Sequence, residues 1–91
     1  MSDCIFCKVA AGEIPAQVVR RGDGMLAFRD LHAQAPTHLL VIPTHHVASL
    51  NDVGDAGLLG RLLAFARDTA REAGVADRGY RVVVHTNPDG G

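Results

Sequence analysis

The chain is 91 residues long, which accommodates one domain and little more. Nine Lys and Arg stand against ten Asp and Glu, and aromatic residues make up only 4%. With no basic excess and few rings for base stacking, nucleic-acid binding is disfavoured. The hydrophobic content of 47% argues against intrinsic disorder. The composition therefore predicts a single folded domain over residues 1–91.

The sequence carries no sign of export or of insertion into a membrane. It opens without a basic region followed by an apolar one, and no apolar run approaches the roughly 20 residues that span a bilayer. Its two cysteines are too few for a disulfide scaffold, and their Cys-x-x-Cys spacing suits a reducing compartment. We expect a small, soluble, cytoplasmic protein with no membrane partner.

Two glycines predict a hairpin near the N-terminus. Short extended-looking runs at residues 18–21 and 25–29 flank Gly-Asp-Gly at 22–24, and these glycines allow the positive φ of a tight turn. We predict a β-hairpin over residues 17–30, preceded by a short helix. The continuous apolar run at residues 38–42 predicts a strand with both faces covered, or nearly so.

The clearest helical pattern lies in the second half of the chain. Leucines and alanines at positions 58, 59, 62, 63, 66 and 70 recur every three or four residues and form one apolar stripe, which Gly74 ends. Residues 80–85 then predict a last strand. Strands joined by a hairpin and one long helix indicate an α+β fold, an antiparallel sheet with the helix packed on one face.

The Cys-x-x-Cys pair is compatible with three kinds of chemistry. A thioredoxin-like redox pair needs a preceding strand, and the sequence shows none before Cys4. Cys4 and Cys7 could instead be ordinary, partly buried thiols. Two thiolates at this spacing could also bind one tetrahedral zinc ion, with His45 or His46, just after a predicted strand, as a third ligand.

Three polar side chains near strand ends indicate a ligand cleft. His38 begins the apolar strand and His85 ends the last one, where polar groups gather around bound molecules. Asp30 follows the hairpin, and a carboxylate there can accept both hydroxyls of a ribose. From the residues alone, the sequence indicates a possible metal site and a possible polar cleft.

Seven blocks of sequence, in order along the chain, resemble the histidine-triad (HIT) family and specifically its Hint branch. They are DCIFCKV (3–9), GEIPA (12–16), LAFRD (26–30), QAPTHLLVIP (34–43), HVASL (46–50), GYR (79–81) and DGG (89–91). The resemblance implies a HIT-like antiparallel sheet with one long helix packed on it, and a homodimer that binds a purine nucleotide such as AMP. We expect the dimer contact on the apolar surface of the helix at 58–70 or on residues 80–85.

The same resemblance implies roles for individual side chains. The base would be contacted by Ile5, Phe6, Val9 and Phe28, and the ribose hydroxyls would be bound by Asp30, with Leu31 beside it. His38 would orient the catalytic histidines, and His85 stands near the phosphates, where the family usually has Asn. A structural zinc ion would be held by Cys4, Cys7 and His46, with a later histidine as fourth ligand.

The defining motif of the resembled family, His-x-His-x-His-x-x, is absent from these residues. In relatives it closely follows the Asp-Gly-Gly found here at 89–91, and it carries the nucleophilic histidine. The resemblance therefore implies a nucleoside phosphoramidate hydrolase that forms a nucleotidyl-histidine intermediate, with its nucleophile beyond Gly91 in a longer protein. Two alternatives stay open: a non-catalytic nucleotide-binding or dimerisation module truncated before the triad, and a zinc-dependent protein-interaction module.

Overall fold

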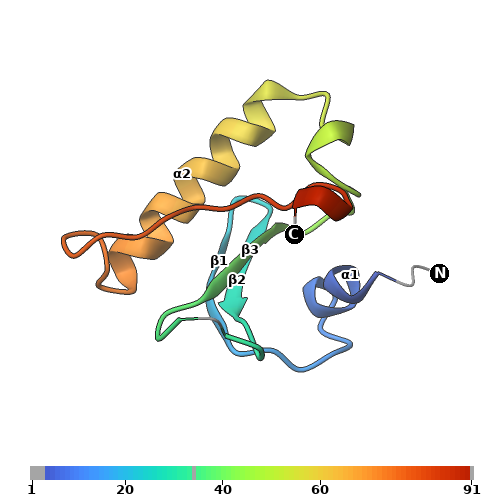
Figure 1. Cartoon of the computed structure of the whole chain (residues 1–91). Coiled ribbons are helices and arrows are strands. Elements are labelled where there is room, and N and C mark those ends of the chain that lie inside the picture. Colours follow the sequence, from blue (N-terminus) through green and yellow to red (C-terminus); the bar gives the residue numbers. More distant parts are fainter. Residues whose placement is uncertain (1–3, 34, 91) are drawn as a thin grey trace. The chain divides into compact units, whose positions relative to one another are not determined.

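The computed structural model describes residues 4–33 and 35–90, and the chain divides into two compact units. The N-terminal unit is Met1–His46 and the C-terminal unit is Val47–Gly91. The elements in chain order (Figure 1) are a short helix, three strands, a 3-10 turn, a long helix and a second 3-10 turn. The antiparallel sheet, the long helix and the short N-terminal helix are all present, so the predicted α+β class is confirmed.

The predicted hairpin is present and closes through a two-residue turn. Strand β1, Val18–Gly22, pairs antiparallel with β2, Met25–Arg29. Asp23 and Gly24, the two turn residues, have φ of 54° and 75°. Positive φ at both positions characterises the type I′ turn, whose twist matches that of paired strands. The turn residues thus set the register in which Gly22 faces Met25.

The third strand completes a sheet of order β1-β2-β3. Strand β3, Leu39–Pro43, pairs antiparallel with β2, one residue later at each end than the apolar run predicts. Its residues are all half-buried, whereas four of the five residues of the central strand β2 are buried. Among the described residues β3 is therefore an edge strand, and its apolar run does not reflect full coverage of both faces.

The core of the N-terminal unit lies on one face of this sheet. Leu26 and Phe28 are alternate residues of β2, so their side chains point to the same face. They cluster with Val9 of α1, Ile5–Ala10, and all three are buried. Four half-buried side chains pack around them: Ile14, Ala16, Leu40 and Ile42. This face of the sheet therefore carries helix α1.

The long helix α2, Ala56–Glu72, spans the predicted apolar stripe and ends just before Gly74, as the sequence predicts. Asp55 precedes it, and one carboxylate oxygen accepts a hydrogen bond of 2.8 Å from the Gly57 N–H. At the other end Gly74 has a φ of 79°, and the Val75 N–H reaches back to the Ala70 carbonyl at 3.1 Å. A left-handed residue at this position ends a helix while satisfying its last carbonyls.

The buried face of α2 differs from the predicted stripe. Its buried residues are Leu58, Phe65, Thr69 and Ala70, and Leu63, which the stripe included, is exposed. Positions 58, 65 and 69 are separated by seven and four residues, so they share one face of a helix. The pattern of leucines and alanines alone missed Phe65, which lies near the centre of that face.

The strand predicted over residues 80–85 is wrong for the described chain. This segment has no regular secondary structure and is drawn as a coil that leads to the turn Pro88–Gly90 (Figure 1). Tyr80, Val82, Val83 and Val84 are all exposed. A β-branched run becomes a strand only where a neighbouring chain accepts its backbone hydrogen bonds, and none of the described segments does so.

Neither α1 nor α2, the α-helices of the described chain, has the length and apolarity to cross a membrane.

Candidate functional site

Two thiols and an imidazole meet at the start of the N-terminal unit. Cys4 directly precedes α1, Cys7 lies within its first turn, and His46 comes three residues after β3. Their ligand atoms all lie within 4.8 Å of one another, and the Cys7 Sγ is 3.1 Å from the His46 Nδ1. The neighbouring His45 is not part of this cluster. The fold thus selects one of the two histidines that the residue pattern left open.

The start of the helix favours the thiolate form of Cys4. The backbone N–H of Cys7 points toward the Cys4 sulfur and is the largest influence that lowers its pKa, to about 7 from an ordinary value of 9.0. The Cys7 thiol and the His46 ring lower this pKa further, while partial burial opposes them. A thiol with this pKa is substantially ionised near neutral pH, the form in which sulfur binds metals.

The chemistry and spacing of this cluster fit zinc. Zn–S bonds of about 2.3 Å at tetrahedral angles place two ligand sulfurs about 3.8 Å apart. The observed limit of 4.8 Å among the three donor atoms is compatible with such a site after small side-chain rotations. Two cysteines and one histidine are three of the four ligands of a common structural zinc site. Among the described residues, Cys4, Cys7 and His46 form the group of at least three potential metal ligands whose donor atoms lie close together.

At the opposite end of β2, Asp30 and His38 form a pair. The Asp30 N–H donates to the His38 carbonyl at 3.1 Å, which continues the β2–β3 ladder by one step. One Asp30 carboxylate oxygen lies 3.4 Å from the His38 Nε2. The other accepts a hydrogen bond of 2.9 Å from the backbone N–H of His32. The carboxylate and the imidazole, predicted separately to line a cleft, are therefore direct neighbours.

The contact between Asp30 and the His32 N–H is a feature that the sequence reading missed. An Asp side chain that accepts from the backbone two residues later forms an Asx turn. The Asp-Leu-His sequence at the end of a predicted strand was the available signal. This turn fixes the carboxylate close to the backbone and leaves its second oxygen toward His38.

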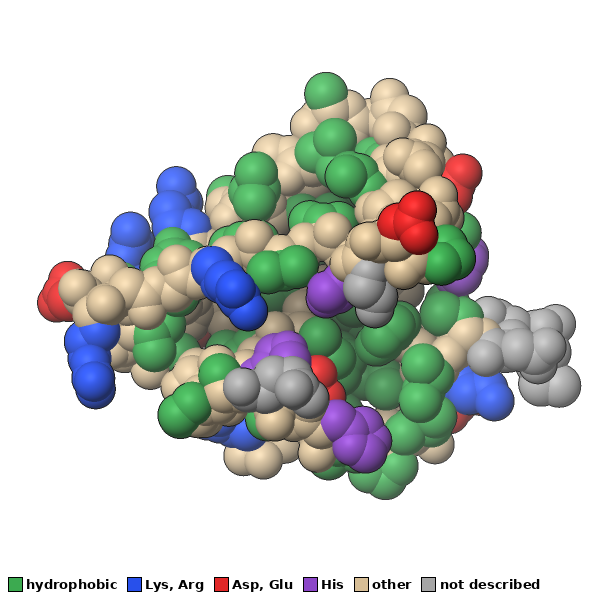
Figure 2. Space-filling view, viewed as in Figure 1, with side chains coloured by type: hydrophobic (Ala, Val, Ile, Leu, Met, Phe, Trp, Pro, Cys, Tyr) green, Lys and Arg blue, Asp and Glu red, His purple; other side chains and the backbone are tan. Residues whose placement is uncertain are grey.

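The apolar residues predicted to contact a base divide into two groups. Val9 and Phe28 are buried in the core, whereas Ile5 and Phe6 on α1 are exposed. The Phe6 and Phe28 rings have centroids 6.4 Å apart and planes inclined by 46°. Hydrophobic side chains are visible on the surface of α1 (Figure 2). Leu31, next to Asp30, is 89% exposed and contributes nothing to the core.

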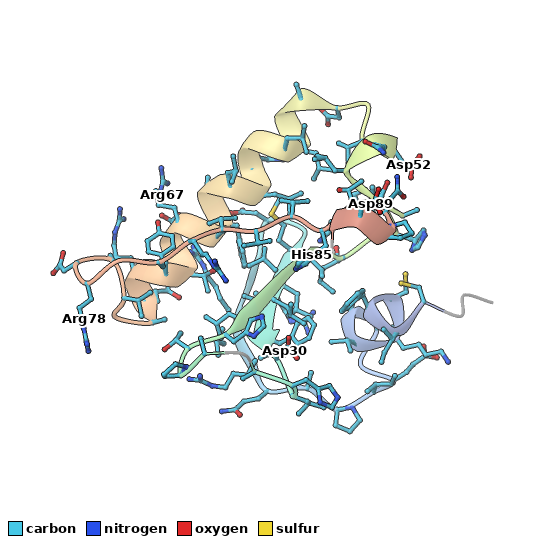
Figure 3. The ribbon with its side chains drawn as sticks, in the orientation of Figure 1. Asp30, Asp52, Arg67, Arg78, His85 and Asp89 are labelled. Atoms are coloured by element: carbon cyan, nitrogen blue, oxygen red, sulfur yellow. The ribbon has the colours of Figure 1, made fainter. Side chains whose placement is uncertain are left out.

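Alternation along the strands brings the aromatic and polar groups to one face. Phe28 and Asp30 are two residues apart, and Leu40 and His38 stand opposite them on β3. Side chains two residues apart in a strand share a face, so the Asp30–His38 pair lies on the face that carries α1. Figure 3 shows Asp30 at this end of the sheet. The arrangement offers a ring surface and, next to it, a carboxylate and an imidazole.

His85 lies in the C-terminal unit, in a short closed loop. Figure 3 labels its side chain. Its Nδ1 is 2.7 Å from the Gly90 carbonyl oxygen, and Asn87 within the loop has a φ of 63°. A carbonyl can only accept, so the His85 Nδ1 carries the hydrogen in this contact. The Gly90 N–H closes the loop onto the Asn87 carbonyl at 3.1 Å.

Comparison with known proteins identifies the same family along almost the whole chain. Residues 11–91 match the HIT domain family. The purine nucleoside phosphoramidase of Escherichia coli K12 is 41% identical over 91 residues, covering 98% of this chain and 76% of the relative. Protein HitA of Neisseria gonorrhoeae is 40% identical over 93 residues, covering 100% of this chain and 86% of the relative.

Solved structures show the same likeness. A HIT family hydrolase from Legionella pneumophila Philadelphia 1 superposes with a TM-score of 0.92 at 49% identity, covering 98% of this chain and 81% of that one. A histidine triad protein from Clostridium difficile gives a TM-score of 0.94 at 41% identity, with 100% and 81% covered. The fold and the order of the sequence blocks therefore agree with one family.

Proposed function

This chain belongs to the HIT domain family, and from that premise we propose that it binds purine nucleotides and serves nucleoside phosphoramidate hydrolysis. The E. coli relative is named for a purine nucleoside phosphoramidase activity, and the Legionella structure is titled a hydrolase. The substrate class proposed here is an adenosine or guanosine 5′-phosphoramidate, with AMP or GMP as the nucleotide product.

One observation carries the proposal: the shared face of the β2–β3 pair. On it, the Phe6–Phe28 ring contact lies beside the carboxylate of Asp30 and the imidazole of His38. A purine has an apolar face that stacks on aromatic rings, and a ribose has two adjacent hydroxyl donors. An aromatic surface followed by a carboxylate matches these two parts of a nucleoside in order.

In this proposal Asp30 is the ribose acceptor. Its carboxylate has two oxygens, one held by the His32 N–H and the other 3.4 Å from the His38 ring. Each oxygen has two lone pairs, so both can still accept a hydroxyl hydrogen. The Asx turn holds the carboxylate in one orientation, which lowers the entropy that binding must overcome.

The base-contact residues are Ile5, Phe6, Val9 and Phe28, and Leu31 stands beside the ribose acceptor Asp30. Of these, Ile5 and Phe6 present apolar surface to solvent, while Val9 and Phe28 are buried in the core and the Phe28 ring contacts that of Phe6. A purine laid on this surface removes apolar area from water at about 25 cal/mol per Å². The proposal therefore assigns direct contact to the exposed pair and support to the buried pair.

Cleavage of the P–N bond requires an imidazole nucleophile, donors for the phosphate oxygens and a group that orients the nucleophile. We propose His38 as the orienting group and His85 as a phosphate contact. The nucleophilic histidine of the His-x-His-x-His-x-x motif is not among the 91 residues, and the proposal assigns it to sequence that follows Gly91. The nucleotidyl group would pass to this histidine as the P–N bond breaks and the amine leaves with a proton. Water would then take the nucleotidyl group, which gives the free nucleotide and restores the imidazole.

We further propose that Cys4, Cys7 and His46 hold a structural zinc ion. The convergence of their donor atoms within 4.8 Å supports this assignment. A bound ion would tie the start of α1 to the chain after β3, and so hold the helix that carries the base-contact side chains. A reducing compartment such as the cytoplasm keeps both thiols available for the metal.

A homodimer is part of the same proposal. The exposed apolar side chains of the C-terminal unit, Leu63 of α2 and the valines of residues 80–85, support a contact with a second copy of the chain. Sedimentation velocity over a hundredfold range of concentration tests this: a dimer at the higher concentrations is expected. A monomer at all concentrations would contradict it.

The proposed function is tested in two steps. Calorimetry with AMP on the 91-residue chain and on protein extended past Gly91 tests nucleotide binding. Release of AMP from adenosine 5′-phosphoramidate by the extended protein tests catalysis. Binding together with turnover supports the proposal. Binding by both proteins without turnover by the extended one would leave the non-catalytic nucleotide-binding module as the function. Absence of AMP binding in both would overturn the nucleotide assignment altogether.

A further inference from the structure

The two thiols of the metal cluster lie three residues apart at the start of α1. Cys4 precedes α1 directly and Cys7 is three residues later, and the Lys8 N–H donates to the Cys4 carbonyl at 3.2 Å, which marks the first closed turn. Both thiols are half-buried rather than enclosed. The same two sulfurs can therefore be reached by a metal ion and by a small oxidant.

We propose that Cys4 and Cys7 form a reversible dithiol–disulfide couple whose oxidation by a peroxide removes the two sulfur ligands and releases the metal. The proposal rests on the zinc site proposed above, because release requires that the metal be bound there first. Only these two sulfurs change; His46 keeps its imidazole throughout.

The geometry permits the disulfide without refolding of the helix. Residues three apart in a helical turn have Cα atoms about 5 Å apart, within the range of about 4.4–6.8 Å that disulfides span. The two sulfurs already lie within 4.8 Å of each other. Rotation of the two side chains is then the movement required. The disulfide and the zinc complex use the same two sulfur atoms. The chain therefore cannot hold the disulfide and keep both sulfur ligands on the ion at the same time.

The chemical step balances with hydrogen peroxide as the two-electron oxidant. One cysteine sulfur attacks a peroxide oxygen, the O–O bond breaks, and a sulfenic acid and water form. The second sulfur then attacks the sulfenic sulfur, the S–S bond forms, and a second water leaves. Two thiols and one peroxide thus give one disulfide and two waters. In the zinc-loaded chain the sulfurs are thiolates, so two protons come from solvent and the zinc ion leaves as Zn²⁺. A small dithiol or glutathione reverses the reaction by thiol–disulfide exchange.

Oxidation has a defined structural consequence in the N-terminal unit. The metal joins the start of α1 to His46, whereas the contact of Val9 with Leu26 and Phe28 is independent of the metal. Loss of the ion should therefore release the start of α1, including Phe6, from the chain after β3, while the disulfide closes the turn itself and the sheet and the core contact stay in place. The redox state of two cysteines would in this way control the order of the proposed base-contact surface.

The experiment uses zinc-loaded protein treated with hydrogen peroxide in steps. A chromophoric chelator measures free zinc, and intact mass of the same samples measures the loss of two hydrogen atoms per chain. We expect zinc release to rise in proportion to disulfide, and dithiothreitol followed by fresh zinc to restore the loaded form. Retention of zinc in the oxidised chain, or oxidation that yields only sulfinic acid or disulfides between chains, would overturn the proposal.

Two variants separate this proposal from the zinc site itself. H46Q keeps both thiols, and we expect it to form the disulfide with little zinc to release. C7S keeps Cys4, and we expect no intramolecular disulfide and no peroxide-dependent release of whatever zinc it retains. If the unaltered protein binds no zinc, the proposed release of zinc is overturned. Disulfide formation in the metal-free chain then still tests whether Cys4 and Cys7 form a dithiol–disulfide couple. If zinc binds and the disulfide does not form, the zinc site stands and the couple fails.

Discussion

The two units of the chain make different use of similar apolar sequence. In the N-terminal unit the run that forms β3 pairs with β2, and the central strand is buried along four of its five residues. In the C-terminal unit the run at residues 80–85 pairs with no described segment, and its three valines are exposed. Strand formation thus depends on the availability of a partner edge, which composition does not report.

The candidate functional groups follow the same division. The metal cluster and the Asp30–His38 pair both lie in the N-terminal unit, at opposite ends of strands whose register is set by pairing. The His85 loop in the C-terminal unit is held by its own local hydrogen bond to Gly90. The metal cluster and the Asp30–His38 pair thus depend on strand pairing between distant residues, whereas His85 is positioned by a loop of neighbouring residues.

The largest expected effect is on the free energy of unfolding. It compares an apolar residue in a paired strand, Leu26, with one in a segment that has no strand partner, Val83. Leu26 is fully buried in the core cluster, so Leu26→Ala should lower the free energy of unfolding by about 3 kcal/mol. Val83→Ala removes apolar surface that is exposed in the single chain and, at concentrations too low for the proposed dimer, should change the free energy of unfolding by less than about 0.5 kcal/mol. Urea unfolding followed by circular dichroism measures both.

A large loss in Val83→Ala would show that residues 80–85 are buried in solution. That outcome would point to a partner for this segment, such as a second copy of the chain. Repeating the unfolding at a tenfold different protein concentration distinguishes an intermolecular contact, since its contribution depends on concentration.

The second prediction concerns the proposed metal site. Cys7→Ser removes a sulfur that lies 3.1 Å from the His46 Nδ1, so zinc affinity should fall by at least about 100-fold. His45→Gln, at the adjacent exposed position outside the cluster, should leave the affinity unchanged. Competition with a chelator of known zinc affinity measures both. Equal losses in the two variants would contradict the selection of His46 by the fold.

The third prediction concerns the carboxylate of the Asp30–His38 pair. Asp30→Asn keeps the side-chain shape and removes the charge that accepts ribose hydroxyls, so AMP affinity should fall by about tenfold. Asp23→Asn makes the same chemical change in the hairpin turn, where Asn tolerates positive φ, and should leave AMP affinity unchanged. Calorimetry of the three proteins checks this. An unaltered affinity in Asp30→Asn would remove the ribose assignment.

The smallest expected effect is on the local hydrogen bonds of α2 in the C-terminal unit. Asp55→Ala removes the carboxylate that caps the helix at the Gly57 N–H and should cost about 1 kcal/mol of stability. Arg61→Ala removes only an exposed ion pair of 3.5 Å to the same carboxylate and should cost less than about 0.5 kcal/mol. Thermal unfolding of both variants tests whether capping or charge pairing matters more at this helix end.

The sequence by itself determined the features that local interactions control. The type I′ turn follows from Asp23-Gly24, the end of α2 follows from Gly74, and both were predicted near their observed positions. The ordered sequence blocks also determined the family, which the comparisons confirmed. The Cys-x-x-Cys spacing placed two thiols on one helical turn, because neighbouring residues have little freedom to separate.

The tertiary structure alone decided the features that depend on distant contacts. It paired Asp30 with His38, placed Phe65 rather than Leu63 on the buried face of α2, and left residues 80–85 without a strand partner among the described segments. It also brought His46, which the family resemblance names and the residue pattern alone does not separate from His45, to the thiols. In each case the apolar or polar character of the residue was evident from sequence. What it contacts depends on the register of paired strands and on packing across the fold, which a local pattern does not contain.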